Sequence, residues 1–255
     1  MQIHFLRHAT FILKLKGAEL LVDPMLSPAE SMNPIGGAAS NKRIPMVELP
    51  LSAEELTKVL SRISAVLISH RHQDHWDAHA KALLSKDIRI FCQPEDEARI
   101  RADGFKNVTS IQSEHIWQGI TLHRTAGRHG SGEIGKKMGA VSGFVITAEG
   151  EPSLYVAGDT ILCPEVTDAL QKHKPDVIVV NAGGTRFLTG GPITMTSEDV
   201  AGVCRSASSS ARIVAVHMEA VNHCVETRED LRKFLEEEKL LEQVLIPADG
   251  DLLTF

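Results

Sequence analysis

Short apolar runs separated by turn residues dominate the chain. The first three, residues 2–5, 11–15 and 19–22, are too short for helices and predict an N-terminal meander of strands. Later apolar runs of similar length predict further strands at residues 65–68, 88–92, 108–111, 119–126, 140–148, 153–157, 177–180, 213–216, 244–245 and 252–255. The pattern therefore predicts strands from one end of the chain to the other.

Helical patterns lie between many of these strands. The clearest helix begins after Ser52, because Glu55 stands three residues later and completes a capping box. That helix should run to Leu60. Further helices are predicted at residues 78–84, 95–102, 163–173, 197–206 and 228–239. In the helix at residues 78–84, we expect Leu83 and Leu84 to pack against the core.

The order of these elements predicts the fold class. Strands come first, then alternating strands and helices, then a second strand-rich block and a second alternating block. Two sheets packed face to face with helices outside would bury the apolar side of every element. No linker, repeat or low-complexity run separates the halves. We therefore expect an α/β protein with a single domain spanning residues 1–255.

Residues 25–50 interrupt the pattern. They are rich in Pro, Gly, Ser, Asn and Met and show no periodicity. A long irregular loop inside a compact domain usually serves a function or is disordered. We interpret this segment as a candidate lid.

Composition narrows the cellular setting. The hydrophobic fraction is 43%, and no apolar segment approaches the ~20 residues of a membrane-spanning helix. The N-terminus lacks the pattern of a secretory signal. The four cysteines are widely spaced, which argues against a disulfide framework and against a thiolate zinc site. We expect a cytoplasmic protein with no membrane partner.

Charge argues against nucleic acid as a partner and for a small anion. The net charge of −6 and the pI near 6.1 are unlike the basic face of a nucleic-acid-binding protein. Against this acidic background, Arg128, Lys136, Lys137 and Arg186 stand in loops near candidate site residues. They predict an anionic substrate such as a phosphate or carboxylate. The alternative interpretation of the lysine pair is a solvated loop.

Residues 69–77 carry the strongest chemical signal. Directly after the apolar run 65–68, the sequence places three histidines and two aspartates within eight residues. His70 and His72 are two apart and would point the same way at an extended strand end, while Asp74 and His75 follow where the chain must turn. One segment can therefore serve two metal ions. The alternative is a solvated histidine-rich loop.

Three more candidate ligands follow predicted strands. His129 follows the strand at 119–126, Asp159 follows that at 153–157, and His217 follows that at 213–216. Imidazole nitrogens and carboxylates bind zinc, but manganese, iron and nickel accept the same donors. We therefore predict a metal-dependent hydrolase, with zinc as the expected metal.

In these residues, the chain resembles the metallo-β-lactamase-fold hydrolase superfamily. The resemblance lies in the motif His70-x-His72-x-Asp74-His75 and the later strand-end residues, and it spans nearly the whole chain. It implies a four-layer αββα sandwich of two mixed sheets with two divalent metal ions at one edge. The ligand sets that it implies are His70, His72 and His129 for the first metal, Asp74, His75 and His217 for the second, and Asp159 as the bridge. It also implies that Asp74 orients the attacking water and accepts its proton.

A closer resemblance points to one branch of that superfamily. Residues 6–10, Leu-Arg-His-Ala-Thr, and 21–24, Leu-Val-Asp-Pro, are similar to the ascorbate-6-phosphate lactonases and related hydrolases. The accessory domain of the RNA-processing members has no counterpart in this chain. The insert at 25–50 and the stretch at 219–223 depart from the pattern, so no substrate is transferred from the branch.

Several residues near the predicted ligands have open roles. His223, six residues after His217, is a candidate general acid or substrate contact; alternatively it replaces His217 as the ligand or is structural. His8 and Asp23 are placed near the floor of the site. Asp23 could orient a ligand histidine, or both residues could simply stabilise turns.

These observations leave three functional hypotheses. The leading one is a dinuclear metal hydrolase that uses metal-activated water on a small anionic ester, lactone or phosphodiester. An iron-dependent redox protein or oxygenase on the same scaffold is the second. The third, a nuclease, is disfavoured by the net charge. The sequence leaves the oligomeric state open, with a homo-oligomer among the alternatives.

Overall fold

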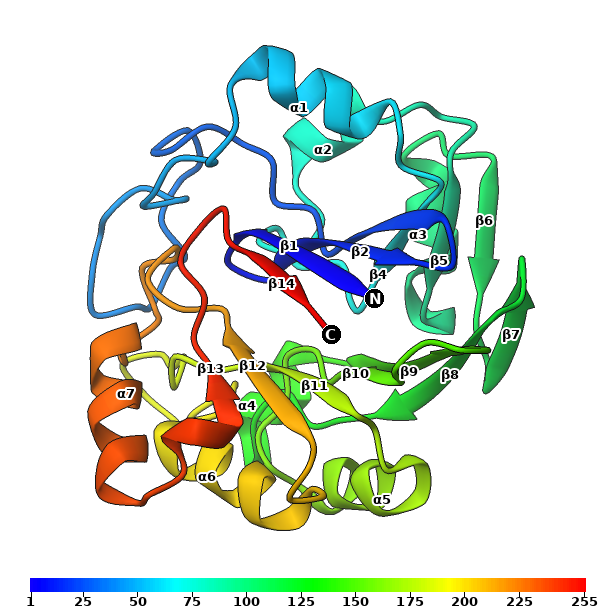
Figure 1. Ribbon diagram of the computed structural model, residues 1–255. Helices are drawn as coiled ribbons and strands as arrows, with labels where there is room; N and C mark the ends of the chain where they lie inside the picture. The colour runs from blue at the N-terminus through cyan, green and yellow to red at the C-terminus, as the bar shows by residue number, and fades with distance from the viewer.

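The structure, a computed structural model describing residues 1–255, consists of two seven-stranded sheets packed face to face with helices outside (Figure 1). In the first sheet the spatial order is β14 (Leu252–Thr254), β1 (Gln2–Arg7), β2 (Thr10–Leu15), β3 (Ala18–Val22), β4 (Ala65–Ile68), β5 (Arg89–Cys92) and β6 (Asn107–Ser110). In the second sheet it is β13 (Val244–Leu245), β12 (Arg212–Val216), β11 (Val177–Asn181), β10 (Leu154–Val156), β9 (Ser142–Ala148), β8 (Ile120–Ala126) and β7 (Glu114–Trp117). Both sheets are mixed, so the predicted αββα sandwich is confirmed.

The helices cover the two outer faces. The first sheet is covered by α1 (Ala53–Leu60), α2 (Ala78–Leu83) and α3 (Pro94–Ala102). The second is covered by α5 (Pro164–His173), α6 (Ser197–Ser206) and α7 (Arg228–Glu237), followed by the short 3₁₀ helix η1 (Leu241–Gln243). A further short helix, α4 (Gly132–Met138), contains no buried residue. Figure 1 shows α1 and α2 above the sandwich and α5 to α7 below it.

Strand β4 is apolar throughout because both of its faces are buried. Successive side chains of a strand point to opposite faces. Ala65 and Leu67 therefore enter the layer between the sheets, and Val66 and Ile68 pack under the outer helices. All four are buried, as in strands covered on both faces. This central strand delivers residues 69–77 to the rim of the sandwich.

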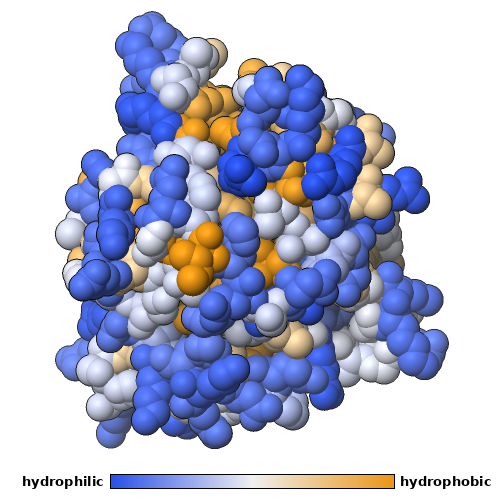
Figure 2. Space-filling model, turned by 90° about the vertical axis from the view of Figure 1, so that its right-hand side faces the viewer, coloured by the Kyte–Doolittle hydropathy of each residue, from blue (hydrophilic) through white to orange (hydrophobic).

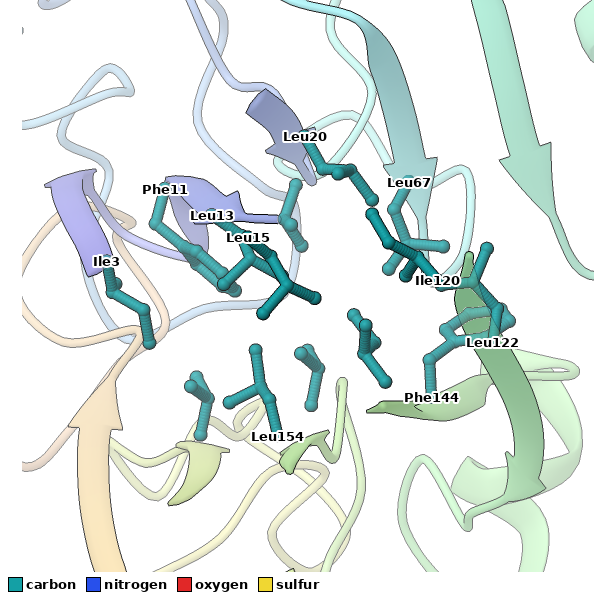
Figure 3. Packing of buried hydrophobic residues seen from close by; sticks show 14 of the residues in the cluster. Ile3, Phe11, Leu13, Leu15, Leu20, Leu67, Ile120, Leu122, Phe144 and Leu154 are labelled. Atoms are coloured by element: carbon teal, nitrogen blue, oxygen red, sulfur yellow. The ribbon is translucent and has the colours of Figure 1, made fainter. Parts of the chain in front are cut away.

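The layer between the sheets is entirely apolar at its centre. Figure 3 shows Leu13, Leu15 and Leu20 of the first sheet facing Phe144 and Leu154 of the second. Burying an aliphatic or aromatic side chain of this size contributes about 1.5–3 kcal/mol each. The two sheets therefore hold one another in a fixed relation, and so do the loops at their common edge.

The face of the molecule beside β6 and β7 is mostly polar (Figure 2). Figure 2 shows hydrophilic side chains over most of the face beside β6 and β7, with small and separate apolar patches. None of the helices combines the length and the apolar character needed to cross a membrane.

Most predicted elements are confirmed to within two residues of their ends, and the capping box of Ser52 and Glu55 is present. Three elements were missed, namely β7, α4 and the short 3₁₀ helix η1. Strand β7 has no buried residue, and α4 is rich in glycine, so neither carries an apolar signal. The prediction for Leu83 was wrong. Its side chain is 44% exposed because α2 ends there, whereas Leu84 is buried.

Residues 25–50 form an irregular but well-anchored loop. The fully buried guanidinium of Arg7 donates hydrogen bonds to the carbonyls of Val47 at 2.8 Å, Met25 at 2.7 Å and Ser27 at 2.9 Å. Near the middle of the loop, the Asn222 side chain exchanges hydrogen bonds with the backbone of Ile35. The loop thereby forms part of the wall beside the predicted site. Its role as a lid stays a prediction.

Replacing Arg7 by Met should destabilise the protein by about 3 kcal/mol and make residues 25–50 sensitive to proteolysis, since three buried carbonyls would lose their donors. Arg43→Met is the matched control. Arg43 also donates three hydrogen bonds to this loop, but it is exposed, so its loss should cost less than about 1 kcal/mol. Urea unfolding and limited proteolysis measure both effects. Equal losses in the two variants would contradict this account.

Candidate metal centre

The motif after β4 is shaped by its own turn and anchors. The backbone N–H groups of His75 and Trp76 both donate to the carbonyl of His72, which closes a turn directly after the strand. Trp76 is buried against Phe105, with ring centres 5.2 Å apart. Asp77 caps α2 by accepting from the backbone N–H of Ala80 at 2.6 Å. Trp76 and Asp77 therefore anchor the end of the motif, and its first residues lie at the rim of the sandwich.

The structure brings all the predicted ligands together. Three segments from the second sheet meet the motif, one after each of β8, β10 and β12. The residues that lie within one compact cluster are His70, His72, Asp74, His75, His129, Asp159 and His217. His72 is partly exposed and the other members are buried. A sixth imidazole, that of His8, lies in the same cluster.

One group of nitrogens consists of three imidazoles. The Nε2 atom of His70 lies 2.9 Å from Nδ1 of His72, and Nε2 of His129 lies 3.3 Å from the same atom. The Nδ1–H of His129 donates to the carbonyl of Ile193 at 2.7 Å, and burial lowers the pKa of His129, so its Nε2 carries a bare lone pair. Lone pairs converge on one point here. A cation with metal–nitrogen bonds of ~2.0–2.1 Å fits this donor set.

A second group combines Asp74, His75 and His217. The Nε2 atoms of His75 and His217 each lie 3.8 Å from Oδ2 of Asp74. Asp159 stands between the two groups. Its Oδ1 lies 3.2 Å from His217 Nε2, and its Oδ2 lies 3.3 Å from His75 Nε2 and 3.6 Å from His129 Nε2. This carboxylate can contact both groups at once.

Polar neighbours orient these donors. Oδ2 of Asp23 accepts from His75 Nδ1 at 2.9 Å and from the Ser69 hydroxyl at 2.6 Å. The His75 Nε2 atom is thereby directed into the cluster, which is the orienting role considered for Asp23. Asn181, at the end of β11, donates to Oδ1 of Asp159 at 2.7 Å. Sequence reasoning missed Asn181, although its strand-end position matches that of the predicted ligands.

The electrostatics of the cluster favour a cation. Burial alone would raise the pKa of Asp159, but His217 and His75 hold it well below its usual value. Burial alone would lower the pKa of His217, but Asp159 raises it to about 10. In the same way, Asp159 and Asp74 outweigh burial and raise the pKa of His75 well above its usual value. Two buried carboxylates therefore attract positive charge, which a metal ion supplies in place of protons.

A cavity of about 200 Å³ opens onto the cluster. It is lined by Ile35, His72, Gln73, Asp74, His129, Met138, Asp159, Phe187 and His223. The apolar members come from three separate segments, the 25–50 loop, the end of α4 and the loop after β11. No sequence pattern marked them, because each is a single apolar residue within an irregular or glycine-rich stretch.

The predicted basic residues do not line this cavity. Arg128 pairs with Glu165 at 2.8 Å, and both side chains are substantially exposed. The lysine pair stands on α4 rather than in a loop, and Lys136 pairs with Glu133 at 2.6 Å. None of the four predicted basic residues is therefore among the residues that line the cavity, and the two lysines of α4 are exposed to solvent.

His223 lines the cavity but lies outside the donor groups. This geometry removes the support for the alternative in which it replaces His217, whose Nε2 is within the cluster. Burial lowers the pKa of His223 to about 4, so its ring is neutral at pH 7. Its Nδ1 is buried without a hydrogen-bond partner, and its ring lies 5.6 Å from that of Phe187. A neutral imidazole in this place can offer a hydrogen bond to a bound molecule.

Comparison with known proteins agrees with this geometry. A family model described as "Beta-lactamase superfamily domain" matches residues 19–218, a span that holds all the predicted ligands. The chain belongs to the β-lactamase superfamily. Within it, the chain is similar to the UPF0173 protein YddR of Bacillus subtilis, with 38% identity over 258 residues and the full length of both proteins.

Two solved structures that are similar to this chain extend the comparison. One is the isothiocyanate hydrolase from Delia radicum gut bacteria, with 37% identity, a TM-score of 0.93 and coverage of 100% of this chain and 99% of that one. The other is a "possible metal-dependent hydrolase" from Veillonella parvula, with 34% identity, a TM-score of 0.95 and the same coverage. The chain is thus a member of a family of metal-dependent hydrolases. Its resemblance to the ascorbate-6-phosphate lactonase branch stays a prediction.

Metal should stabilise the folded protein, since only the folded chain brings these donors together. Adding Zn²⁺ to the metal-free protein at 100 times its Kd should raise the free energy of unfolding by about 3 kcal/mol. Asp159→Asn should lose most of this gain, whereas Asp77→Asn, another buried carboxylate near the cluster, should keep it. Thermal unfolding with and without Zn²⁺ measures the difference. Full stabilisation of Asp159→Asn by Zn²⁺ would refute the assignment.

Proposed function

We propose that this protein is a dinuclear metal hydrolase that acts on a small, neutral electrophile with an apolar substituent. The observation that carries the proposal is the position of Asp159, within 3.6 Å of donors from both groups and in the lining of a cavity that also holds three apolar side chains. The first metal would be held by His70, His72 and His129. The second would be held by Asp74, His75 and His217, with Asp159 shared.

The donor set fits divalent ions, with zinc as the first expectation and manganese, iron or nickel as alternatives. Bound there, two such ions would lower the pKa of water towards ~7 and polarise the bond under attack. The chain's own contribution is orientation and exclusion of bulk water. Asp74 remains ionised because His75 and the hydrogen bond from His8 outweigh burial and hold its pKa well below the usual value. Its carboxylate can therefore accept a hydrogen bond from the attacking water and receive a proton.

His223 would act on the other side of the substrate. It lines the cavity, and its neutral ring can donate a hydrogen bond to the atom that gains negative charge. Phe187, Ile35 and Met138 would hold the substituent. These three residues come from irregular or glycine-rich segments and form the apolar part of the cavity lining.

An isothiocyanate fits these requirements. Its central carbon is electrophilic, the group is uncharged, and its substituent is apolar in simple cases. Attack of water on that carbon would form a C–O bond, break one π bond to nitrogen or sulfur and move negative charge to that atom, where a donor such as His223 is needed. Asp74 would take the proton of the water, and cleavage of the C–N bond would then release an amine and carbonyl sulfide. The isothiocyanate hydrolase that is 37% identical to this chain over its whole length supports this class of substrate.

The anionic substrate predicted from the sequence has lost its side-chain support. Neither Arg128 nor Lys136 contributes to the cavity, and each is paired with a glutamate. A nuclease would need a basic groove along a phosphate backbone, and the lining residues include no lysine or arginine. The neutral class is therefore the better match to the cavity.

Asp74→Ala should abolish turnover of a neutral isothiocyanate by the metal-loaded enzyme, a loss of at least ~10²-fold in kcat, and should weaken the second metal. Asp77→Asn is the control within the same motif, because its carboxylate caps α2 and belongs to none of the donor groups. Loss of isothiocyanate absorbance reports turnover, and metal analysis after dialysis reports occupancy. Wild-type turnover in Asp74→Ala would rule out its role.

Phe187→Ala should lower kcat/KM for benzyl isothiocyanate about tenfold, since the substituent loses an apolar wall. The neighbouring Leu188, 71% exposed and outside the cavity lining, provides the control variant Leu188→Ala, which should be unchanged. The same assay with a carboxylated isothiocyanate, a lactone and a phosphodiester tests charge preference. Faster turnover of the anionic compounds than of the neutral one would overturn the proposed substrate class.

A further inference from the structure

His8 occupies an unusual place beside the metal centre. It lies in the tight connection between β1 and β2, outside both proposed ligand sets and outside the matched span 19–218. Its side chain is fully buried, and its backbone adopts φ of 60°, in the left-handed region. A non-glycine residue there costs about 1 kcal/mol or more, and such strain persists where surrounding contacts impose it.

Three contacts connect His8 to the second group of donors. Its Nε2 lies 3.2 Å from Oδ2 of Asp74. Its ring lies on that of His217, with centres 3.7 Å apart and planes tilted by 37°. Its backbone carbonyl accepts from the backbone N–H of His217 at 2.8 Å. One residue of the first sheet thus contacts two donors of the second group, and one of these donors follows a strand of the second sheet.

The ring geometry separates a ligand from a supporting residue. Imidazoles that share one ion radiate from it, and with metal–nitrogen bonds of ~2.0–2.1 Å their centres lie about 5 Å apart. The pairs His72–His129 at 5.2 Å and His75–His217 at 5.3 Å follow this rule. The His8–His217 pair, with centres 3.7 Å apart and planes tilted by 37°, is too close for two rings that share an ion. His8 therefore packs on a ligand instead of joining it.

The hydrogen bond to Asp74 has a defined direction. An ionised carboxylate only accepts, so the proton of this bond is on Nε2 of His8. The other ring nitrogen, Nδ1, is buried without a partner. This arrangement leaves Nε2 with no lone pair for a metal and ties one side of the Asp74 carboxylate to the β1–β2 turn. The remaining lone pairs of Asp74 are available to the metal and to water.

We propose that His8 is a positioning residue, which fixes the Asp74 carboxylate and the His217 ring for the second metal. This inference rests on the proposed dinuclear site. The N–H of His8 holds the carboxylate, its ring face restricts rotation of His217, and its carbonyl fixes the backbone where β12 ends. The second metal site is thereby assembled across the two sheets.

Titration of the metal-free protein with Co²⁺ in competition with a chelator tests this role. His8→Phe keeps a ring on His217 but removes the donor, and it should weaken binding of the second Co²⁺ by about 10–100-fold, with the first within threefold of wild type. His8→Gln restores a donor and should recover part of the loss. His4→Gln, which changes a histidine on β1 outside the site, is the matched control and should match wild type.

The role would be overturned by three results. Unchanged affinity for the second Co²⁺ in His8→Phe would show that His8 does not position the donors of that site. Equal losses at both sites, matched by a lower melting temperature of the metal-free variant, would reduce His8 to a packing residue. If the X-ray absorption spectrum of His8→Phe showed one fewer imidazole bound to the second Co²⁺, His8 would be a metal ligand. These readouts need no substrate, so a wild-type protein that binds two Co²⁺ ions but fails to hydrolyse isothiocyanates would overturn only the proposed activity.

Discussion

Two buried carboxylates among bare imidazole nitrogens set the main constraint on this structure. Asp74 and Asp159 are both nearly inaccessible to solvent, and burial of unpaired charge is strongly unfavourable. No lysine or arginine lines the cavity beside them. A bound cation would therefore complete the site electrostatically, and the polar neighbours of the cluster orient its donor atoms. Asp23, Asn181 and His8 each hydrogen-bond to one donor side chain. Their partners are His75, Asp159 and Asp74, respectively, and each partner keeps further atoms or lone pairs for a metal.

The sandwich makes this arrangement rigid. β4 and the turn after β1 approach from the first sheet, and the segments after β8, β10 and β12 approach from the second. A common apolar layer holds the sheets in register, so donors far apart in sequence keep fixed separations. The strained backbones of His8 at φ 60°, Asp23 at 42° and His217 at 69° lie at this edge. Packing and hydrogen bonds maintain conformations that these residues would otherwise avoid.

The sequence predicted the donors better than the cavity, for a physical reason. His70, Asp159 and His217 each follow an apolar strand. The apolar run and the metal-binding residue after it are both visible in the local sequence, so the meeting of these residues in one site could be predicted. The cavity walls depend on side chains such as Ile35 and Phe187, which become neighbours only through tertiary packing. The anionic-substrate prediction relied on charge near the ligands in sequence, but pairing with Glu133 and Glu165 directs that charge elsewhere. Helix α4 was missed because none of its side chains is buried.

That last property of α4 has a consequence for how the family can diversify. Because α4 contributes no buried residue, substitutions at its exposed positions other than glycine should change the unfolding free energy by only about 0.5 kcal/mol. Yet Met138 at its end forms one wall of the cavity. Mutational tolerance and a place in the cavity lining thus coincide in one short helix. Drift there can reshape what the enzyme accepts while the metal ligands and the sandwich stay the same.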